Sequence, residues 1–222
     1  MSEELALLYA NHFGDADRAW KNEVWSILWS RVFSRWVKPD DTLLDLGAGY
    51  CEFVNHAVAR KRYAVDLNPE TARNAVAGVE VKAVSADKLD FLENASVDVV
   101  FTSNFLEHLP SKSAVSGVFD EVTRVLKPGG RFILMGPNIR FLADKYWDYF
   151  DHHVPLSHLT ICEALELHRF SIDHVEPRFL PYTVKGSRLR LRALVHLYLS
   201  LRPLSSLFLG KQFFIVATRP HH

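Results

Sequence analysis

Acidic residues and a pair of glycines are spaced in this chain as a nucleotide-binding site requires. The run LLDLGAG, residues 43–49, ends an apolar stretch in Asp45 and turns at once through Gly47 and Gly49. Glycine lacks a Cβ atom, so such a turn lets a ligand lie against bare backbone. Asp66 ends the next apolar run, 19 residues after Gly47, where a carboxylate can accept hydrogen bonds from ribose hydroxyls. These residues predict a cofactor that contains a nucleoside.

Glu52 distinguishes between two kinds of nucleoside cofactor. A dinucleotide-binding turn has a third glycine three positions after the second, and Glu52 occupies that position. A carboxylate there would face the pyrophosphate at a helix N-terminus, where an anion belongs. A nicotinamide-dependent oxidoreductase is therefore disfavoured. A cofactor with a positive centre fits better, because carboxylates attract it.

Four stretches follow one another in a characteristic order: LLDLGAG at 43–49, VDLN at 65–68, VSAD at 84–87, and VDVVFTSNFLEHL at 97–109 with VLKPGGRF at 125–132. Together, over roughly Asp41 to Asn138, they resemble the class I S-adenosylmethionine-dependent methyltransferases. The resemblance implies S-adenosylmethionine as cofactor, with its methionine part at the glycine turn, its ribose on Asp66 and its adenine amino group near Asp87. The cofactor-binding residues that it implies are Asp45, Gly47, Ala48, Gly49, Asp66, Leu67, Ala86, Asp87, Asn104 and Phe105.

Cys51 departs from the family's pattern, which usually has a third glycine at this position. We expect its side chain either to crowd the turn or to contact the methionine part of the cofactor. A nucleophilic thiolate at a helix N-terminus is a less favoured alternative to a small packed residue.

Histidines supply the candidate bases for methyl transfer to a hydroxyl group. Such a reaction needs the acceptor, methyl and sulfur aligned, and an oxygen of high pKa also needs a base in the range where histidine titrates. His108 follows the fourth expected strand, and His152 and His153 lie in an aromatic, acidic and histidine-rich segment at 146–158. We expect His153 or His152 to be the base, oriented by Asp151, with His108 as the third candidate.

Two alternatives for these histidines stay open. Loop histidines can simply hydrogen-bond to the backbone. A metal site would combine Asp151, His152, His153 and His158, but this spacing matches no zinc pattern, and no metal is expected.

Strands and helices alternate along the chain so as to position these residues. Strands are expected at 42–46, 63–66, 79–84, 97–102, 131–135, 171–176 and 212–218. Helices are expected at 55–59, from Asn68, over 111–125, and from a capping-box pattern at Thr160 to Glu163. This order predicts an α/β fold with a doubly wound, seven-stranded, mostly parallel sheet, the Rossmann-like methyltransferase fold. Ligands of such sheets bind beyond the carboxyl ends of the strands, where the candidate residues fall.

Two segments are expected to flank the sheet within a methyltransferase domain at 38–222. Residues 1–37 predict a helix with one aromatic face, which forms a lid over the ligand or packs on the domain. Residues 183–210 predict a helical, leucine-rich insertion before the last strand. All 26 acidic residues precede residue 177, whereas eight basic residues follow it: Arg178, Lys185, Arg188, Arg190, Arg192, Arg202, Lys211 and Arg219.

Composition and charge limit the location and the partners. The 222 residues hold two cysteines, no basic N-terminal leader and no apolar run of a membrane span, so a cytoplasmic location is expected. The basic insertion suggests contact with anionic lipid at the inner face of the membrane, or a mouth for a lipid-linked or phosphorylated acceptor. The alternative is a helix that packs on residues 1–37 or on a partner subunit in a homodimer. Nucleic acid is not expected as a partner, because the rest of the chain is acidic and shows no groove-reading motif.

The leading expectation is an S-adenosylmethionine-dependent methyltransferase that O-methylates a small hydroxylated metabolite, such as a sugar or a lipid-linked precursor. A non-catalytic cofactor-binding partner protein is the first alternative, motivated by Cys51 and the apolar insertion. A nicotinamide-dependent oxidoreductase is the second.

Overall fold

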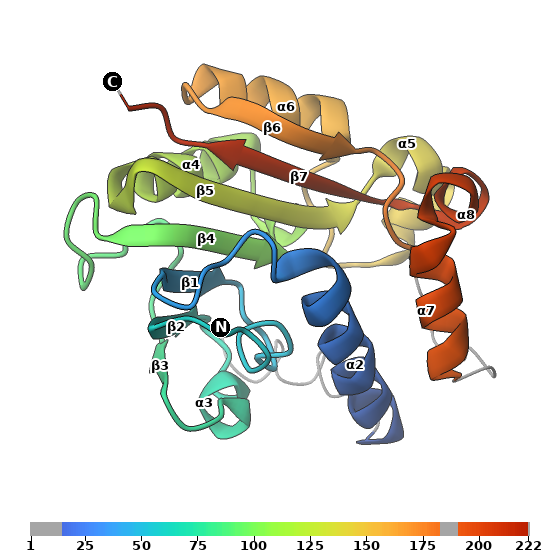
Figure 1. Ribbon diagram of the computed structural model, residues 1–222. Coiled ribbons are helices and arrows are strands. Elements are labelled where there is room, and N and C mark those ends of the chain that lie inside the picture. Colours follow the sequence, from blue (N-terminus) through green and yellow to red (C-terminus); the bar gives the residue numbers. More distant parts are fainter. Residues whose placement is uncertain (1–14, 183–190, 222) are drawn as a thin grey trace.

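The computed structural model describes residues 15–182 and 191–221, which form a twisted sheet between layers of helices (Figure 1). The sheet has seven strands in the order β3-β2-β1-β4-β5-β7-β6. Strands β1 to β5 pair in parallel, and β7 runs antiparallel to both of its neighbours. The expected doubly wound, mostly parallel sheet is confirmed. The strands are β1 (Thr42–Leu46), β2 (Lys61–Val65), β3 (Val79–Lys82), β4 (Val97–Ser103), β5 (Leu126–Pro137), β6 (Ser171–Glu176) and β7 (Gln212–Thr218).

Side chains of the central strands alternate between two hydrophobic cores, one on each face of the sheet. Leu44 of β1 and Val100 of β4 pack with buried residues of α4 (Lys112–Val125) and α6 (His158–Leu167). Leu43 and Phe101 face the opposite core. Burial on both faces explains why these strands read as continuous apolar runs in the sequence.

The N-terminal helix packs on that second core. Helix α2 (Asp15–Leu28) continues into a π-helical turn, η1 (Trp29–Phe33). Phe33 is fully buried, and its ring centroid lies 5.4–6.3 Å from the ring centroids of Trp25, Phe53, Phe101, Phe179 and Phe214. Closer to its start, α2 reaches the glycine turn, since the Arg18 guanidinium lies 4.5 Å from the Tyr50 ring centroid. The aromatic face is therefore packed on the sheet, and the role of a lid stays a prediction.

Two predicted helix starts are wrong. Residues 51–56 form successive turns and residues 57–59 are irregular, so the helix expected at 55–59 is absent; Cys51, with a left-handed φ of 62°, begins these turns. Helix α6 begins at His158, not after Thr160. Its capping box joins Ser157 to Thr160, since the Ser157 hydroxyl accepts from the Thr160 amide and the Thr160 hydroxyl accepts from the Ser157 amide.

Strand and helix lengths differ elsewhere too. β5 begins at Leu126, directly after α4, so the turn at residues 127–130 lies within the strand. β3 ends at Lys82, two residues early. The helix expected from Asn68 is the short α3 (Glu70–Asn74), and Asn68 caps it by accepting the Glu70 amide at 3.0 Å.

The predicted insertion consists of two helices, α7 (Arg192–Ser200) and α8 (Arg202–Leu209), which meet at Leu201. Lys185, Arg188 and Arg190 lie outside the described residues. Helix α7 runs beside α2, and the Arg31 guanidinium donates to the Ser200 hydroxyl at 2.9 Å (Figure 1). Within residues 15–182 and 191–221, no helix is long and apolar enough to span a bilayer. The remaining short helices are η2 (Leu106–His108), α5 (Ile139–Leu142) and η3 (Ala143–Asp148).

Candidate cofactor and methyl-transfer site

The glycine turn leaves β1 and is tied to β2 by its backbone. The amides of Gly47 and Ala48 both donate to the Val65 carbonyl, at 2.9 and 3.2 Å. Gly47 and Gly49 have φ angles of 67° and 51°. A Cβ atom at Gly47 would lie 2.4 Å from Cγ of Phe105, whereas one at Gly49 would meet no described atom within 4 Å. Gly47 is therefore required by packing, and Gly49 presents open backbone such as a ligand could approach.

Asp66 holds this turn in place. One oxygen of its carboxylate accepts from the Gly49 amide at 2.7 Å and the other from the Asn68 amide at 2.8 Å. Thr71 closes the arrangement by donating its hydroxyl to the Gly49 carbonyl at 2.7 Å. Each carboxylate oxygen has a second lone pair, so Asp66 can still accept from the hydroxyls of a ribose. Burial raises the pKa of Asp66, and the two backbone amides oppose that rise.

Asp45 and Cys51 lie beneath the turn. Asp45 is 3% exposed, and burial is the main cause that raises its pKa, with the charge of Glu52 adding to the effect. Cys51 is fully buried in a small core with Ala48 and other apolar residues. The Cys51 side chain therefore packs against Ala48 of the turn from within the protein, and its contact with the cofactor stays a prediction. Burial also raises the pKa of its thiol to about 12, which disfavours a thiolate nucleophile.

The other predicted cofactor residues follow the ends of β2, β3 and β4. Leu67 is 45% exposed, and Ala86 is buried. The exposed Asp87 accepts a hydrogen bond from the Ser85 hydroxyl. Asn104 has a left-handed φ of 49°, and its amide donates to the Met135 carbonyl at 3.0 Å. The structure thus joins Asp66 to the turn by a hydrogen bond and brings the Phe105 ring against Gly47.

A histidine–carboxylate cluster lies just beyond β4. The carbonyl of Glu107 accepts from the His153 and Val154 amides at 2.8 and 3.2 Å, which ties the segment after β5 to η2. Nδ1 of His108 lies 3.2 Å from Oδ2 of Asp151 and 3.0 Å from its carbonyl. The rings of His108 and His152 lie 5.1 Å apart between centroids. Two of the three predicted histidines therefore meet around Glu107, while the side chain of His153 is exposed.

The protonation of the two clustered histidines differs. Burial alone would lower the pKa of His108, but the hydrogen bond to Asp151 and the charge of Glu107 outweigh it and raise the pKa to about 9. The same hydrogen bond lowers the pKa of Asp151 to about 2. Burial, and then the charge of His108, lower the pKa of His152 to about 4. At neutral pH His108 is thus a paired imidazolium, and His152 is a neutral imidazole.

Sequence reasoning missed Glu107 as a site residue. It is 2% exposed, and burial raises its pKa. Its position beside His108 was the available signal, but its other neighbours come from a segment more than 40 residues later. His158, by contrast, is outside this cluster and interacts with the Asn138 side-chain amide at 2.9 Å.

A methyltransferase-domain family model matches residues 44–134, which span the glycine turn, Asp66 and the cluster residues after β4. The chain carries a class I S-adenosylmethionine-dependent methyltransferase domain. S-adenosylmethionine is accordingly its cofactor, not a nicotinamide dinucleotide. No curated protein matches this methyltransferase by sequence.

Solved structures share the fold of the methyltransferase. An S-adenosylmethionine-dependent methyltransferase from Archaeoglobus fulgidus is 18% identical with a TM-score of 0.67, covering 89% of this chain and 94% of its own. A methyltransferase from Haloferax volcanii in complex with the Trm112 activator is 16% identical with a TM-score of 0.62, covering 90% and 98%. Geranyl diphosphate C-methyltransferase from Streptomyces coelicolor A3(2) is 17% identical with a TM-score of 0.61, covering 88% and 77%.

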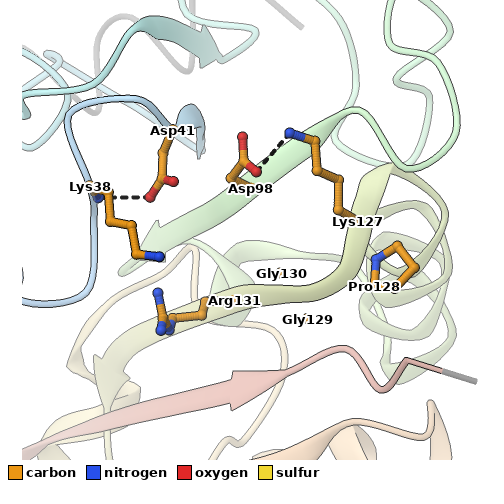
Figure 2. A pocket seen from close by; sticks show the side chains of 8 residues that line it. All are labelled: Lys38, Asp41, Asp98, Lys127, Pro128, Gly129, Gly130 and Arg131. Atoms are coloured by element: carbon orange, nitrogen blue, oxygen red, sulfur yellow. Dashed lines mark hydrogen bonds and ion pairs between the residues drawn. The ribbon is translucent and has the colours of Figure 1, made fainter.

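The methyltransferase also has a shallow hollow of about 150 Å³ at the opposite end of the sheet (Figure 2). The side chains of Asp41, Asp98 and Lys127 in this hollow already have partners. Lys127 pairs with Asp98 at 2.7 Å, Asp98 also accepts from the Thr42 amide, and Asp41 accepts from the Lys38 amide at 2.7 Å. These residues lie at or near the amino ends of β1 and β4, away from the glycine turn, so they do not belong to the cofactor site.

Proposed function

We propose that this methyltransferase transfers a methyl group to a hydroxyl of a small molecule, such as a sugar or a lipid-linked precursor. The observation that carries the proposal is the cluster of Glu107, His108, Asp151 and His152 next to the cofactor turn. Phe105 packs on Gly47, and Glu107 follows it by two residues. A proton-accepting group beside the cofactor is what an oxygen acceptor of high pKa needs.

The glycine turn and the residues after β2 to β4 would hold the cofactor. Open backbone at Gly49 fits the methionine part, and the Asp66 carboxylate fits the ribose hydroxyls. Leu67, Ala86 and Asp87 would flank the adenine, and Asn104 and Phe105 the opposite side. Asp45 is buried next to the turn and would stabilise the conformation of the turn.

S-adenosylmethionine supplies an electrophilic methyl group on a positively charged sulfur when it is bound. The acceptor oxygen would take this methyl group, and the neutral thioether S-adenosylhomocysteine would remain. The chain aligns the acceptor, excludes water and takes the hydroxyl proton. We assign that proton to His152 or His153, since the ring of His152 is neutral and the side chain of His153 is exposed in the same segment. His108, paired with Asp151, would position the segment.

The cofactor assignment is tested by calorimetry with S-adenosylmethionine and S-adenosylhomocysteine. Asp66→Asn should weaken binding of both by tenfold or more, because it removes a charged acceptor for the ribose. Asp173→Asn, which changes an exposed carboxylate near the start of β6, is the matched control and should bind normally. Unchanged affinity in Asp66→Asn would remove its assigned role, and no binding by either ligand would overturn the proposed use of the site.

The reaction is tested by a screen of sugars, phenols and lipid-linked alcohols that measures release of S-adenosylhomocysteine. With an acceptor that the parent chain methylates, the kcat values of His152→Ala and His153→Ala should be compared. The variant that lacks the base should lose about 10²–10⁴-fold in kcat with cofactor affinity kept. Absence of turnover on every hydroxylated acceptor would favour a cofactor-binding partner protein without activity.

We further propose that α7 and α8 bring the protein to anionic lipid. Both helices lie on the side of the molecule toward which β4 and β5 point, so they are near the methyl-transfer end of the sheet (Figure 1). Leu204 is 69% exposed and Phe208 77%. Arg192 at the start of α7 is also exposed, and no acidic residue follows Glu176. An exposed apolar surface beside cations is typical of helices that lie on anionic membranes. A second copy of the chain is the alternative occupant of this surface.

A further inference from the structure

Three side chains of the histidine–carboxylate cluster lie close enough together to coordinate one metal ion. Glu107, His108 and His152 each offer one ligating atom, and these atoms all lie within 4.8 Å of one another. The side chains of Glu107 and His152 are 2% and 5% exposed. Among the described residues, Oε1 of Glu107 and Nδ1 of His152 have no hydrogen-bond partner. Buried polar atoms nearly always have one, so two such atoms in one cluster indicate a bound species.

Asp151 orients the His108 ring by its contact with Nδ1, which leaves Nε2 to face the other two side chains. Its Nδ1 lies 3.2 Å from the Asp151 carboxylate, and its Nε2 lies 3.9 Å from Oε1 of Glu107. The second distance is within the range of an ion pair but too long for a hydrogen bond. A carboxylate on one nitrogen of an imidazole, with the other nitrogen facing further ligands, is the usual arrangement of a metal-binding histidine.

We propose that Glu107, His108 and His152 bind one divalent transition-metal ion, which displaces the proton from Nε2 of His108 to solvent while Nδ1 keeps its hydrogen bond to Asp151. Two imidazoles and one carboxylate favour ions such as Zn²⁺, Fe²⁺, Co²⁺ or Mn²⁺ over Mg²⁺ and Ca²⁺, which prefer oxygen ligands. A tetrahedral ion about 2.1 Å from each ligand needs ligand atoms about 3.4 Å apart, so side-chain shifts of about 1 Å complete the site. Three protein ligands leave one position open for an oxygen of the methyl acceptor.

The role of the ion rests on the proposed function, whereas its binding does not. A hydroxyl bound at the open position loses its proton more easily, so its oxygen becomes a better nucleophile toward the methyl carbon. The proton then goes to His153, because His152 is occupied as a ligand. The sequence offered His152 and His153 equally as the base, whereas this assignment makes His152 a metal ligand and His153 the base.

The test is a titration of the full-length chain with Co²⁺ after removal of bound metal by a chelator. His221→Ala and His222→Ala are included in every sample, because adjacent histidines bind metal by themselves. We expect one equivalent of Co²⁺ per chain, a visible absorption spectrum of nitrogen and oxygen coordination, and its loss on addition of Zn²⁺. Less than about one-fifth of an equivalent, or a spectrum unaffected by Zn²⁺, would overturn the proposal.

Variants distinguish Co²⁺ binding at this cluster from Co²⁺ binding by histidines on the surface. Glu107→Gln and His152→Ala should each weaken Co²⁺ binding by at least tenfold, while His56→Ala, at a surface contact with Asn22, should keep it. Calorimetry with S-adenosylhomocysteine in the same samples reports whether the cofactor site is intact. Co²⁺ binding equal to that of the parent chain in both cluster variants would contradict the proposal even if cofactor binds. If Glu107→Gln unfolds, His108→Asn replaces it, with the same expected loss.

Discussion

Gly47 and Gly49 both have left-handed φ angles, but their surroundings differ. Gly47 is closed in by Phe105, and Gly49 faces open space. A methyl group at Gly47 must displace Phe105, whereas one at Gly49 meets only the space that we assign to the cofactor.

The two alanine variants should therefore separate stability from binding. Gly49→Ala should lose about 1–2 kcal/mol of unfolding free energy from its left-handed φ, and S-adenosylhomocysteine affinity should fall by tenfold or more. Gly47→Ala should lose at least twice as much stability. Urea unfolding and calorimetry measure both quantities. Gly78→Ala, with a φ of 85° outside the turn, is the control and should lose stability without losing affinity. Full affinity in Gly49→Ala would show that no cofactor lies against this backbone.

Single residues differ in how far their sequence predicts their role. The contact between Asp66 and the turn followed from spacing, because parallel neighbouring strands bring their carboxyl ends together. The direction of the Cys51 side chain depends on a φ angle that no sequence pattern shows. Glu107 needed its contacts with the segment after β5, which only the folded chain brings close.

At the scale of elements, the Phe33 ring of η1 lies at the centre of the aromatic contacts that pack the N-terminal helix on the sheet. Phe33→Ala should cost about 3–5 kcal/mol of unfolding free energy, because it leaves a cavity among five aromatic rings. Phe150→Ala removes the same side chain where it is 91% exposed and should change stability by less than about 0.5 kcal/mol. Urea denaturation followed by tryptophan fluorescence measures both, and equal effects would show that η1 is not anchored as described.

The strands were the most predictable elements. Apolar runs that end in an acid or a polar residue marked β1 and β4 well, since these strands are buried on both faces. β2 begins at Lys61, two residues earlier than expected, because its first two residues are basic and not buried. Helix starts were less predictable because competing caps, such as Ser157 and Thr160 before α6, differ only in backbone conformation. The break between α7 and α8 falls next to Pro203, a signal that the even spacing of leucines concealed.

At the scale of the whole molecule, the exposed surface of α7 and α8 predicts binding to lipid. Full-length chain should sediment with vesicles of phosphatidylglycerol and phosphatidylcholine but less with phosphatidylcholine alone. The double variant Leu204→Glu, Phe208→Glu should stay folded and lose this binding, because both side chains are exposed. Leu167→Glu, 78% exposed at the end of α6, is the control. A dimer by light scattering that ignores anionic vesicles would contradict the prediction and assign the surface to a second copy.

The place of β7 in the sheet has a consequence for synthesis. β7 lies between β5 and β6, and β6 pairs with no other strand of the described chain. Until the residues from Gln212 onward have been made, β6 has no strand with which to pair. Two of the seven strands therefore join the sheet only after β7 has been made, and a premature stop before Gln212 removes one strand and leaves the other unpaired. The glycine turn after β1 is made much earlier, but the sheet that carries it is complete only when β7 and β6 have joined.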